Sequence, residues 1–82
     1  MATVTLYRRP GCHLCDDARV VLDRVRADLP FELVERDISL DDALHRRYLE
    51  RIPVVAVDGE EAFDLFVDEA ELRRMLGRVD RP

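Results

Sequence analysis

The sequence has no long apolar run. None of its uncharged stretches approaches the ~18 residues that a helix needs to cross a bilayer. A strand-like pattern also begins at Thr3, which leaves no room for the charged, apolar and cleavage regions of a signal peptide. From these two absences we expect a cytoplasmic protein that has no membrane partner.

Lysine is absent as well, so all 13 basic residues are arginines, and they are interleaved with 18 acidic residues. The formal net charge is −5. No stretch concentrates positive charge into a stripe that could follow a phosphate backbone or an anionic lipid surface. We therefore expect no nucleic-acid partner.

Cysteine is scarce, because the 82 residues contain only Cys12 and Cys15. A structural zinc or iron–sulfur site normally uses four ligands, and the remaining candidates are His13, beside the pair, and the distant His45. A disulfide that closed so short a loop would constrain the unfolded chain very little. We prefer a reactive dithiol and expect no metal; a pair that holds a metal and an inert pair are the alternatives.

What the sequence does contain is a regular succession of strand and helix patterns. Period-two alternation predicts strands, and apolar spacings of three and four predict helices. The predicted elements are, in chain order, a strand over 3–7, a helix over 13–29, a strand over 31–38, a short helix opened by Ser39 with Asp42, strands over 52–57 and 60–66 around the turn Asp58-Gly59, and a helix opened by Asp68-x-x-Glu71. The order β-α-β-α-β-β-α predicts an α/β fold with a four-stranded mixed sheet, in one domain over 1–82.

The two cysteines lie where the first predicted strand gives way to the first predicted helix. The first turn of a helix offers unpaired N–H groups and the positive end of the dipole, and both favour a thiolate. The three-residue spacing places the two sulfurs on one helix face, with Cys12 outermost and Cys15 one turn inward. We therefore predict that Cys12 is the nucleophile and that Cys15 is the resolving thiol that closes a disulfide.

Charged neighbours are predicted to tune the ionisation of Cys12. Arg8 and the helix dipole favour the thiolate, whereas Asp16, four residues after Cys12 on the same helix face, disfavours it. His13 has two interpretations. It is either an ordinary exposed residue of the first turn or a protonated imidazole that adds to the positive field.

Two motifs resemble the glutaredoxin family. Residues 7–12, Tyr-Arg-Arg-Pro-Gly-Cys, and Cys15 are similar to the aromatic, basic and proline lead-in and dithiol of that family, and residues 52–54, Ile-Pro-Val, are similar to its cis-proline segment. The resemblance covers almost the whole chain. It implies a thioredoxin-like fold of the glutaredoxin type and the activity of a thiol–disulfide oxidoreductase.

The resemblance also implies which residues bind the substrate. Arg9 is the basic residue next to the dithiol, and Pro53 corresponds to the proline that is cis in the family. The resemblance implies that the backbone of Ile52 is free to pair with a bound thiol peptide like an added strand. Arg9, Ile52 and Pro53 are therefore the predicted substrate-binding residues.

The sequence departs from glutaredoxins at two places. Residues 13–14, His-Leu, stand between the cysteines where Pro-Tyr is common, and residues 63–67, Phe-Asp-Leu-Phe-Val, replace the glycine-rich segment that receives the γ-glutamyl end of glutathione. Bulky side chains and an added acid there would resist a tripeptide with two carboxylates. The candidate partners are a disulfide-containing protein, as for thioredoxins, or a low-mass thiol, glutathione or another bacterial thiol, as co-substrate. We expect a monomer that needs no bound cofactor, and the alternative function is a binding module without turnover.

Overall fold

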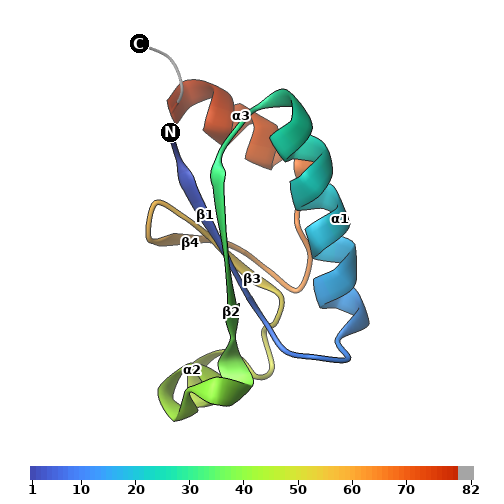
Figure 1. Cartoon of the computed structure of the whole chain (residues 1–82), viewed down its shortest axis with the longest axis vertical. Helices are drawn as coiled ribbons and strands as arrows, with labels where there is room; N and C mark the ends of the chain where they lie inside the picture. Colours follow the sequence, from blue (N-terminus) through green and yellow to red (C-terminus); the bar gives the residue numbers. More distant parts are fainter. Residues whose placement is uncertain (80–82) are drawn as a thin grey trace.

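Four strands form one mixed sheet in the order β2–β1–β3–β4 (Figure 1). The computed structural model describes residues 1–79 and the side chains of residues 1–77. Its elements are β1 (Thr3–Arg8), α1 (His13–Asp28), β2 (Glu32–Asp37), the 3-10 turn η1 (Ile38–Leu40), α2 (Asp42–Tyr48), β3 (Val54–Val57), β4 (Glu60–Asp64) and α3 (Glu69–Val79). The thioredoxin-like β-α-β-α-β-β-α fold predicted from the sequence is thereby confirmed.

The central strand β1 pairs parallel with β2 and antiparallel with β3, which pairs antiparallel with β4. Strands β1 and β2 are parallel because α1 crosses over between them. Strands β3 and β4 are antiparallel because a tight turn joins them at Asp58 and Gly59, both with positive φ. The cysteine loop leaves β1 at the end of the sheet where β2 also ends, so it lies beside the segment that enters β3 (Figure 1).

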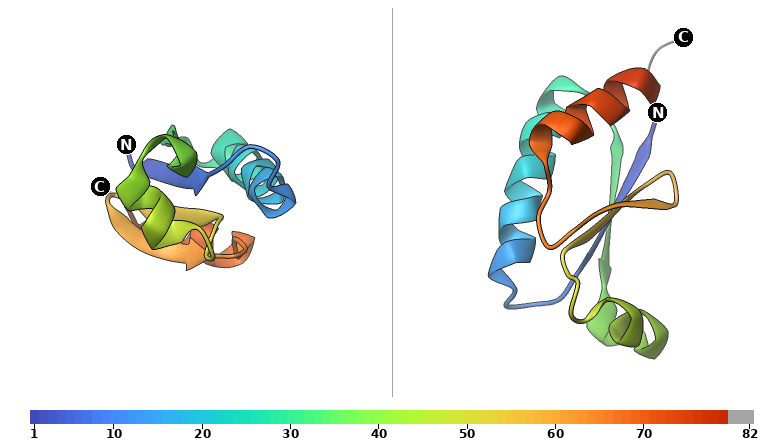
Figure 2. Two further views of the ribbon diagram at one scale, coloured as in Figure 1. Left: turned by 90° about the horizontal axis from the view of Figure 1, so that it is seen from below. Right: turned by 180° about the vertical axis from the view of Figure 1, so that it is seen from behind.

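Alternation along β1 divides the core between the two faces of the sheet. Val4 and Leu6 are fully buried and belong to a large cluster with α1 and α3, which both lie on that face (Figures 1 and 2). Tyr7 belongs instead to a smaller cluster with α2 on the other face. The smaller cluster contains Ile38, Tyr48 and Val54, with Tyr7, Leu44 and Ile52 packed against it.

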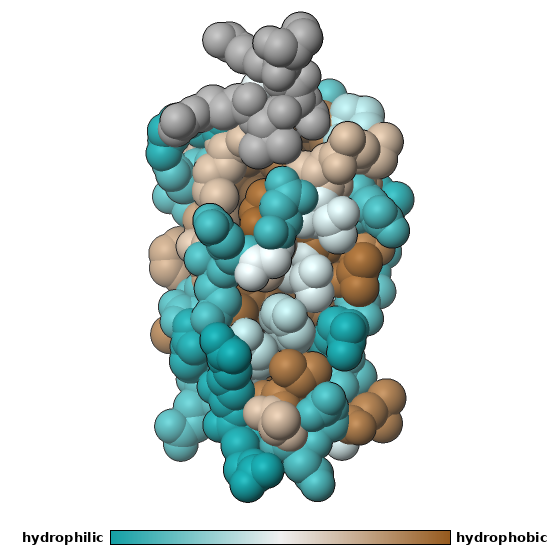
Figure 3. Space-filling view, turned by 90° about the vertical axis from the view of Figure 1, so that its left-hand side faces the viewer, coloured by the Kyte–Doolittle hydropathy of each residue, from teal (hydrophilic) through white to brown (hydrophobic). Residues whose placement is uncertain are grey.

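The side of the molecule opposite α1 is mainly polar (Figure 3). Hydrophilic residues flank a central band of residues of intermediate hydropathy, and hydrophobic residues appear as separate patches in this view. In the part of the chain that the structure describes, no helix has both the length and the apolar character needed to traverse a bilayer.

Several element boundaries differ from those predicted, and β3 begins at Val54 rather than at residue 52. Asp41, not Ser39, caps α2, because its carboxylate accepts hydrogen bonds from the N–H groups of Ala43 and Leu44 at 2.9 and 3.1 Å. Strand β4 ends at Asp64, before the predicted Phe66, because Leu65 has φ +68° and turns the chain out of the strand. Helix α1 ends at Asp28, one residue earlier than predicted. The predicted cap of α3 is confirmed, since Asp68 accepts from the Glu71 N–H at 3.1 Å.

Candidate active site

Cys12 is the N-cap residue of α1. Its extended backbone (φ −90°, ψ 110°) directs the side chain back over the first turn, and Sγ accepts a hydrogen bond from the N–H of Cys15 at 3.2 Å. Gly11 precedes it with φ +81°, a conformation that lets the chain turn from β1 into the helix. Cys12 is partly exposed. A sulfur that is accessible and accepts a helix N–H is placed to react as a thiolate.

Cys15 lies one turn further along α1 and is fully buried. Burial raises the pKa of the Cys15 thiol to about 12, because a thiolate there would lose its hydration, and the hydrogen bond with Cys12 adds to the rise. Both cysteines are free thiols. The structure therefore holds an accessible thiol and a shielded thiol next to each other, and the roles of nucleophile and resolving residue stay predictions.

Arg8 and Asp16 form an ion pair at 2.9 Å. The same guanidinium contacts Glu35 of β2 at 3.3 Å, and Glu35 is bound in turn by Arg19 of α1 at 2.8 Å. The sequence predicted Arg8 and Asp16 as two opposing influences on Cys12, whereas the fold makes them partners that offset one another's charge. The link to Glu35 had no signal in the sequence, because it depends on the register of β2 beside β1.

Arg9, Cys12 and Ile52 line one shallow depression of about 240 Å³, together with Pro10 and Gly11. The Ile52–Pro53 peptide bond is cis, as the resemblance to glutaredoxins implied. The Arg9 side chain forms no hydrogen bond or ion pair with any of residues 1–79, so its guanidinium is available at the edge of this depression. The fold thus brings three of the predicted site residues together from the cysteine loop and the segment before β3. His13 is exposed at the start of α1.

The expectation that the Ile52 backbone is free is wrong for its N–H group. That N–H donates to the carbonyl of Tyr48 at 3.0 Å, because the chain continues to turn after α2, and the Arg51 N–H donates to the same carbonyl at 2.8 Å. A bound chain can therefore use only the Ile52 carbonyl. Pairing through both groups of this residue, as in an added strand, would first require the turn after α2 to open.

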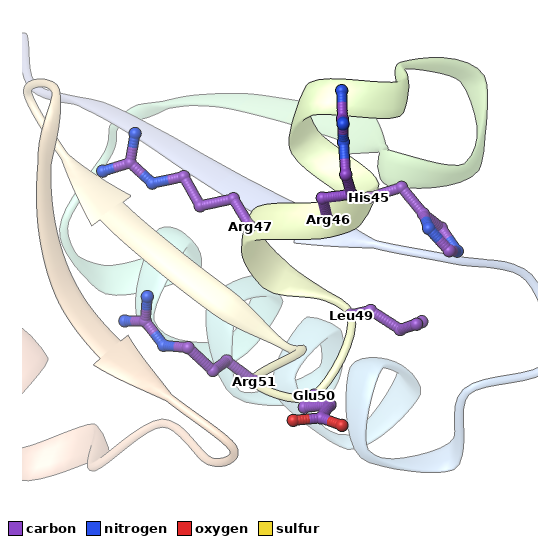
Figure 4. A pocket seen from close by; sticks show the side chains of 6 residues that line it. All are labelled: His45, Arg46, Arg47, Leu49, Glu50 and Arg51. Carbon is purple, nitrogen blue, oxygen red and sulfur yellow. The ribbon is translucent and has the colours of Figure 1, made fainter.

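A larger depression of about 430 Å³ lies at α2, away from the cysteines (Figure 4). The side chains of Arg47 and Arg51 extend in one direction toward the β3–β4 hairpin, whereas His45 and Leu49 extend in another. Arg47 and Arg51 both pair with Glu61, and Arg51 also pairs with Asp64. Their positive charges are therefore offset within the fold, and this depression contains none of the predicted site residues.

Metal ligands are not grouped in the part of the chain that the structure describes, where no cluster of three or more His, Cys, Asp and Glu side chains could hold an ion. The chemistry that the cysteine pair itself offers is thiol–disulfide exchange.

A thioredoxin fold with a Cys-x-x-Cys pair at the start of its first helix defines the class of glutaredoxin-like thioredoxin-fold proteins. The comparisons agree: residues 3–77 match the model of the glutaredoxin-like domain (DUF836), and the chain belongs to this family. An uncharacterized protein of Mycobacterium tuberculosis (strain ATCC 25618 / H37Rv) is 30% identical over 80 residues, which cover 92% of this chain and 82% of that protein.

Solved structures are also similar to this chain. A structural genomics target from X. campestris has 35% identity and a TM-score of 0.76, over 96% of this chain and 99% of that one. Protein Ne2328 from Nitrosomonas europaea has 28% identity and a TM-score of 0.80, over 90% and 89% of the two chains. A thioredoxin from Halobacterium salinarum, with 17% identity and a TM-score of 0.71 over 99% of this chain and 76% of that one, shares the fold.

Proposed function

We propose that this protein is a thiol–disulfide oxidoreductase that reduces disulfides through Cys12 and Cys15. The observation that carries the proposal is the position of Cys12, whose accessible Sγ accepts the Cys15 N–H at the start of α1. Membership of the glutaredoxin-like family supports it, since the match over residues 3–77 includes both cysteines.

The proposed reaction has two displacement steps. In the first, the Cys12 thiolate attacks one sulfur of the substrate disulfide, a Cys12–substrate disulfide forms, and the other substrate sulfur leaves as a thiolate that takes a proton from water. In the second, Cys15 loses its proton and its sulfur attacks Cys12 Sγ. The Cys12–Cys15 bond forms, the mixed disulfide breaks, and the second substrate sulfur leaves and is protonated. The substrate gains two electrons and the protein dithiol loses two.

The second step should be the slower one, because Cys15 has to lose its proton. Burial raises the pKa of the Cys15 thiol, and residues 1–77 include no buried polar or charged side chain that could take its proton. The departing substrate sulfur, which becomes a thiolate as Cys15 attacks, is then the natural acceptor of that proton. We expect the mixed disulfide to be long-lived.

Turnover requires a thiol reductant that converts the Cys12–Cys15 disulfide back to the dithiol. Either two molecules of a low-mass thiol or one external dithiol supply the two electrons, and no bound cofactor takes part. Such a cycle operates in a reducing compartment such as the cytoplasm. Measuring the reduction potential separates the two modes, because a strongly reducing value favours direct reduction of proteins and a milder one favours exchange with a low-mass thiol.

The test uses hydroxyethyl disulfide, a small neutral substrate. Reduced protein is mixed with it without another reductant, quenched in acid and examined by mass spectrometry. We expect wild type to yield the Cys12–Cys15 disulfide, Cys15→Ser to stop at a mixed disulfide on Cys12, and Cys12→Ser to be inert. If wild type reacts no faster than Cys12→Ser with this and every other disulfide offered, the protein is not a reductase and the binding-module alternative takes its place.

A further inference from the structure

Exposed apolar side chains gather beside the dithiol. Leu14, between the two cysteines, is 49% exposed, and Leu65 and Phe66, between β4 and α3, are 49% and 70% exposed. These three residues, hereafter the apolar patch, line one hollow of about 130 Å³ together with Asp17, Ala18, Val21 and Val67. Exposed apolar residues that lie singly need no explanation, but three that converge on one hollow mark a surface for contact.

The loop that carries Leu65 and Phe66 is bonded to the segment that lines the depression at Cys12. The N–H of Leu65 donates to the carbonyls of Arg51 and Pro53 at 3.0 and 2.9 Å, which holds the loop after β4 against the cis-proline segment. Ile52, in that segment, lines the depression with Cys12. A ligand that is covalently attached to Cys12 therefore has the apolar patch within its reach.

Charge is distributed unevenly around this surface. Arg9, in the depression, forms no ion pair with the side chains of residues 1–77 and has a longer-range attraction to Asp37, whereas Arg51, on the far side of the cis-proline segment, is engaged by Glu61 and Asp64. Near the apolar patch the charged groups are acidic: Asp17 lines the hollow and Asp64 precedes Leu65. A ligand carboxylate beside Arg9 would therefore be attracted by the guanidinium. A second carboxylate over the apolar patch would be repelled by Asp17 and Asp64 and would lose hydration.

We propose that this surface receives an extended polypeptide segment that carries the target disulfide, with an apolar side chain over the apolar patch and an acidic side chain toward Arg9. The inference rests on the proposed function and names its substrate class. A small thiol with two separated carboxylates could place one carboxylate beside Arg9, but it has no apolar group for the apolar patch. Because the Ile52 N–H is already bonded to Tyr48, side-chain contacts rather than main-chain pairing determine the selectivity.

The experiment compares four disulfides in single-turnover reactions with pre-reduced protein. The first is a cyclic peptide disulfide with Phe on one side of the reactive cysteine and Glu on the other. The second is the same peptide with Ser and Arg at those positions, the third is hydroxyethyl disulfide and the fourth is glutathione disulfide. We expect the Phe/Glu peptide to react about tenfold faster than the Ser/Arg peptide and than glutathione disulfide.

Variants assign the preference to the surface. Phe66→Ser, and separately Leu14→Ser, should lower the ratio of the Phe/Glu peptide rate to the hydroxyethyl disulfide rate by about fivefold. Arg9→Glu should remove the part of the rate difference between the two peptides that is caused by the Glu of the first peptide and the Arg of the second. The matched control is Val20→Ser, which removes an equally exposed apolar side chain (58%) from α1 outside the hollow and should change neither rate.

Each outcome bears on one proposal. If hydroxyethyl disulfide is reduced but the two peptides react equally, if glutathione disulfide matches the Phe/Glu peptide, or if neither serine variant changes the ratio, the polypeptide-docking inference is overturned and the proposed function stands. If hydroxyethyl disulfide is not reduced at all, the proposed function itself is wrong.

Discussion

The N–H of Cys15 donates to the Sγ of Cys12 across 3.2 Å, so the proposed resolving residue contacts the proposed nucleophile through its backbone. The donor is one of the N–H groups that the start of a helix leaves without an intrahelical partner. A negative charge on a sulfur acceptor satisfies such a group better than a neutral thiol does. The two cysteines thus differ in environment, because Cys12 caps the helix and Cys15 is buried one turn further along it.

Alkylation should distinguish the two thiols. At pH 8, a thiol with the pKa of Cys15, about 12, is ionised in about one molecule in 10,000, and its sulfur is also shielded from solvent. We expect iodoacetamide to modify wild type and Cys15→Ser once, at Cys12, and to leave native Cys12→Ser unmodified over the same period. Peptide mapping identifies the site. Rapid labelling of Cys15 in native Cys12→Ser would contradict the burial described here, whereas labelling in urea is the positive control.

Alkaline pH should weaken the fold through Cys15. Between about pH 9 and about pH 12 the folded state retains a proton on Cys15 that the unfolded state releases, so the free energy of unfolding falls as pH rises through this range. One proton corresponds to a slope of about −1.4 kcal/mol per pH unit. Urea unfolding of Cys12→Ser and of Cys12→Ser/Cys15→Ala from pH 9 to 11 isolates the part of this slope that burial causes, since the contribution of Cys12 is removed from both variants and all other titrating groups are shared. Parallel curves for the two variants would show that Cys15 titrates normally.

The Arg8–Asp16 pair should couple the reactivity of Cys12 to both charges. Arg8→Gln removes the cation and leaves the Asp16 carboxylate uncompensated near the thiol, so alkylation of Cys12 at pH 7 should slow about threefold. Asp16→Asn should accelerate it, and the double variant should return close to wild type. Arg19→Gln, which removes a neighbouring arginine bound to Glu35 and Asp23, is the control and should leave the rate unchanged. Equal rates in all four variants would remove Arg8 and Asp16 from the list of tuning residues.

The cap of α2 should contribute measurably to stability. The Asp41 carboxylate accepts two main-chain N–H groups, so Asp41→Ala should lower the free energy of unfolding by about 1 kcal/mol, and Asp41→Asn should retain most of it. Asp42→Ala is the matched control, because the Asp42 carboxylate is in the same first turn and forms no capping hydrogen bond. Urea unfolding at pH 7 gives all three values. A loss for Asp42→Ala as large as that for Asp41→Ala would mean that charge at the helix start, not the cap, is responsible.

The order of elements could be predicted because each one has a local signal. The period-two pattern of β1, the apolar stripe of α1 and the turn at Asp58-Gly59 depend on neighbours in the sequence, and the fold confirms all three. The cap of α2 was misplaced because Ser39 and Asp41 are both good capping residues. Ser39 lies inside the 3-10 turn over Ile38–Leu40, where its N–H donates to the Asp37 carboxylate, so it does not cap α2.

The parts of the site that could be predicted are those set by residues close together in the sequence. Cys12 and Cys15 were placed by their separation on one helix, whereas the pairing of Arg8 with Asp16 and Glu35 depends on which strand lies beside β1. The bond from the Ile52 N–H to Tyr48 was missed for a related reason, because nothing in the apolar run before β3 shows that the turn of α2 continues into it.

The depression at Cys12 joins two separately anchored walls. The helix that carries the cysteines is fixed by the large cluster on one face of the sheet, and Ile52 rests on the smaller cluster around Tyr48 on the opposite face. Under the proposed function, a change in the smaller cluster such as Tyr48→Ala acts first on the Ile52 wall, and a change in the larger cluster acts first on the helix that holds the two sulfurs. Binding of a substrate and reactivity of Cys12 would then depend on different parts of the core.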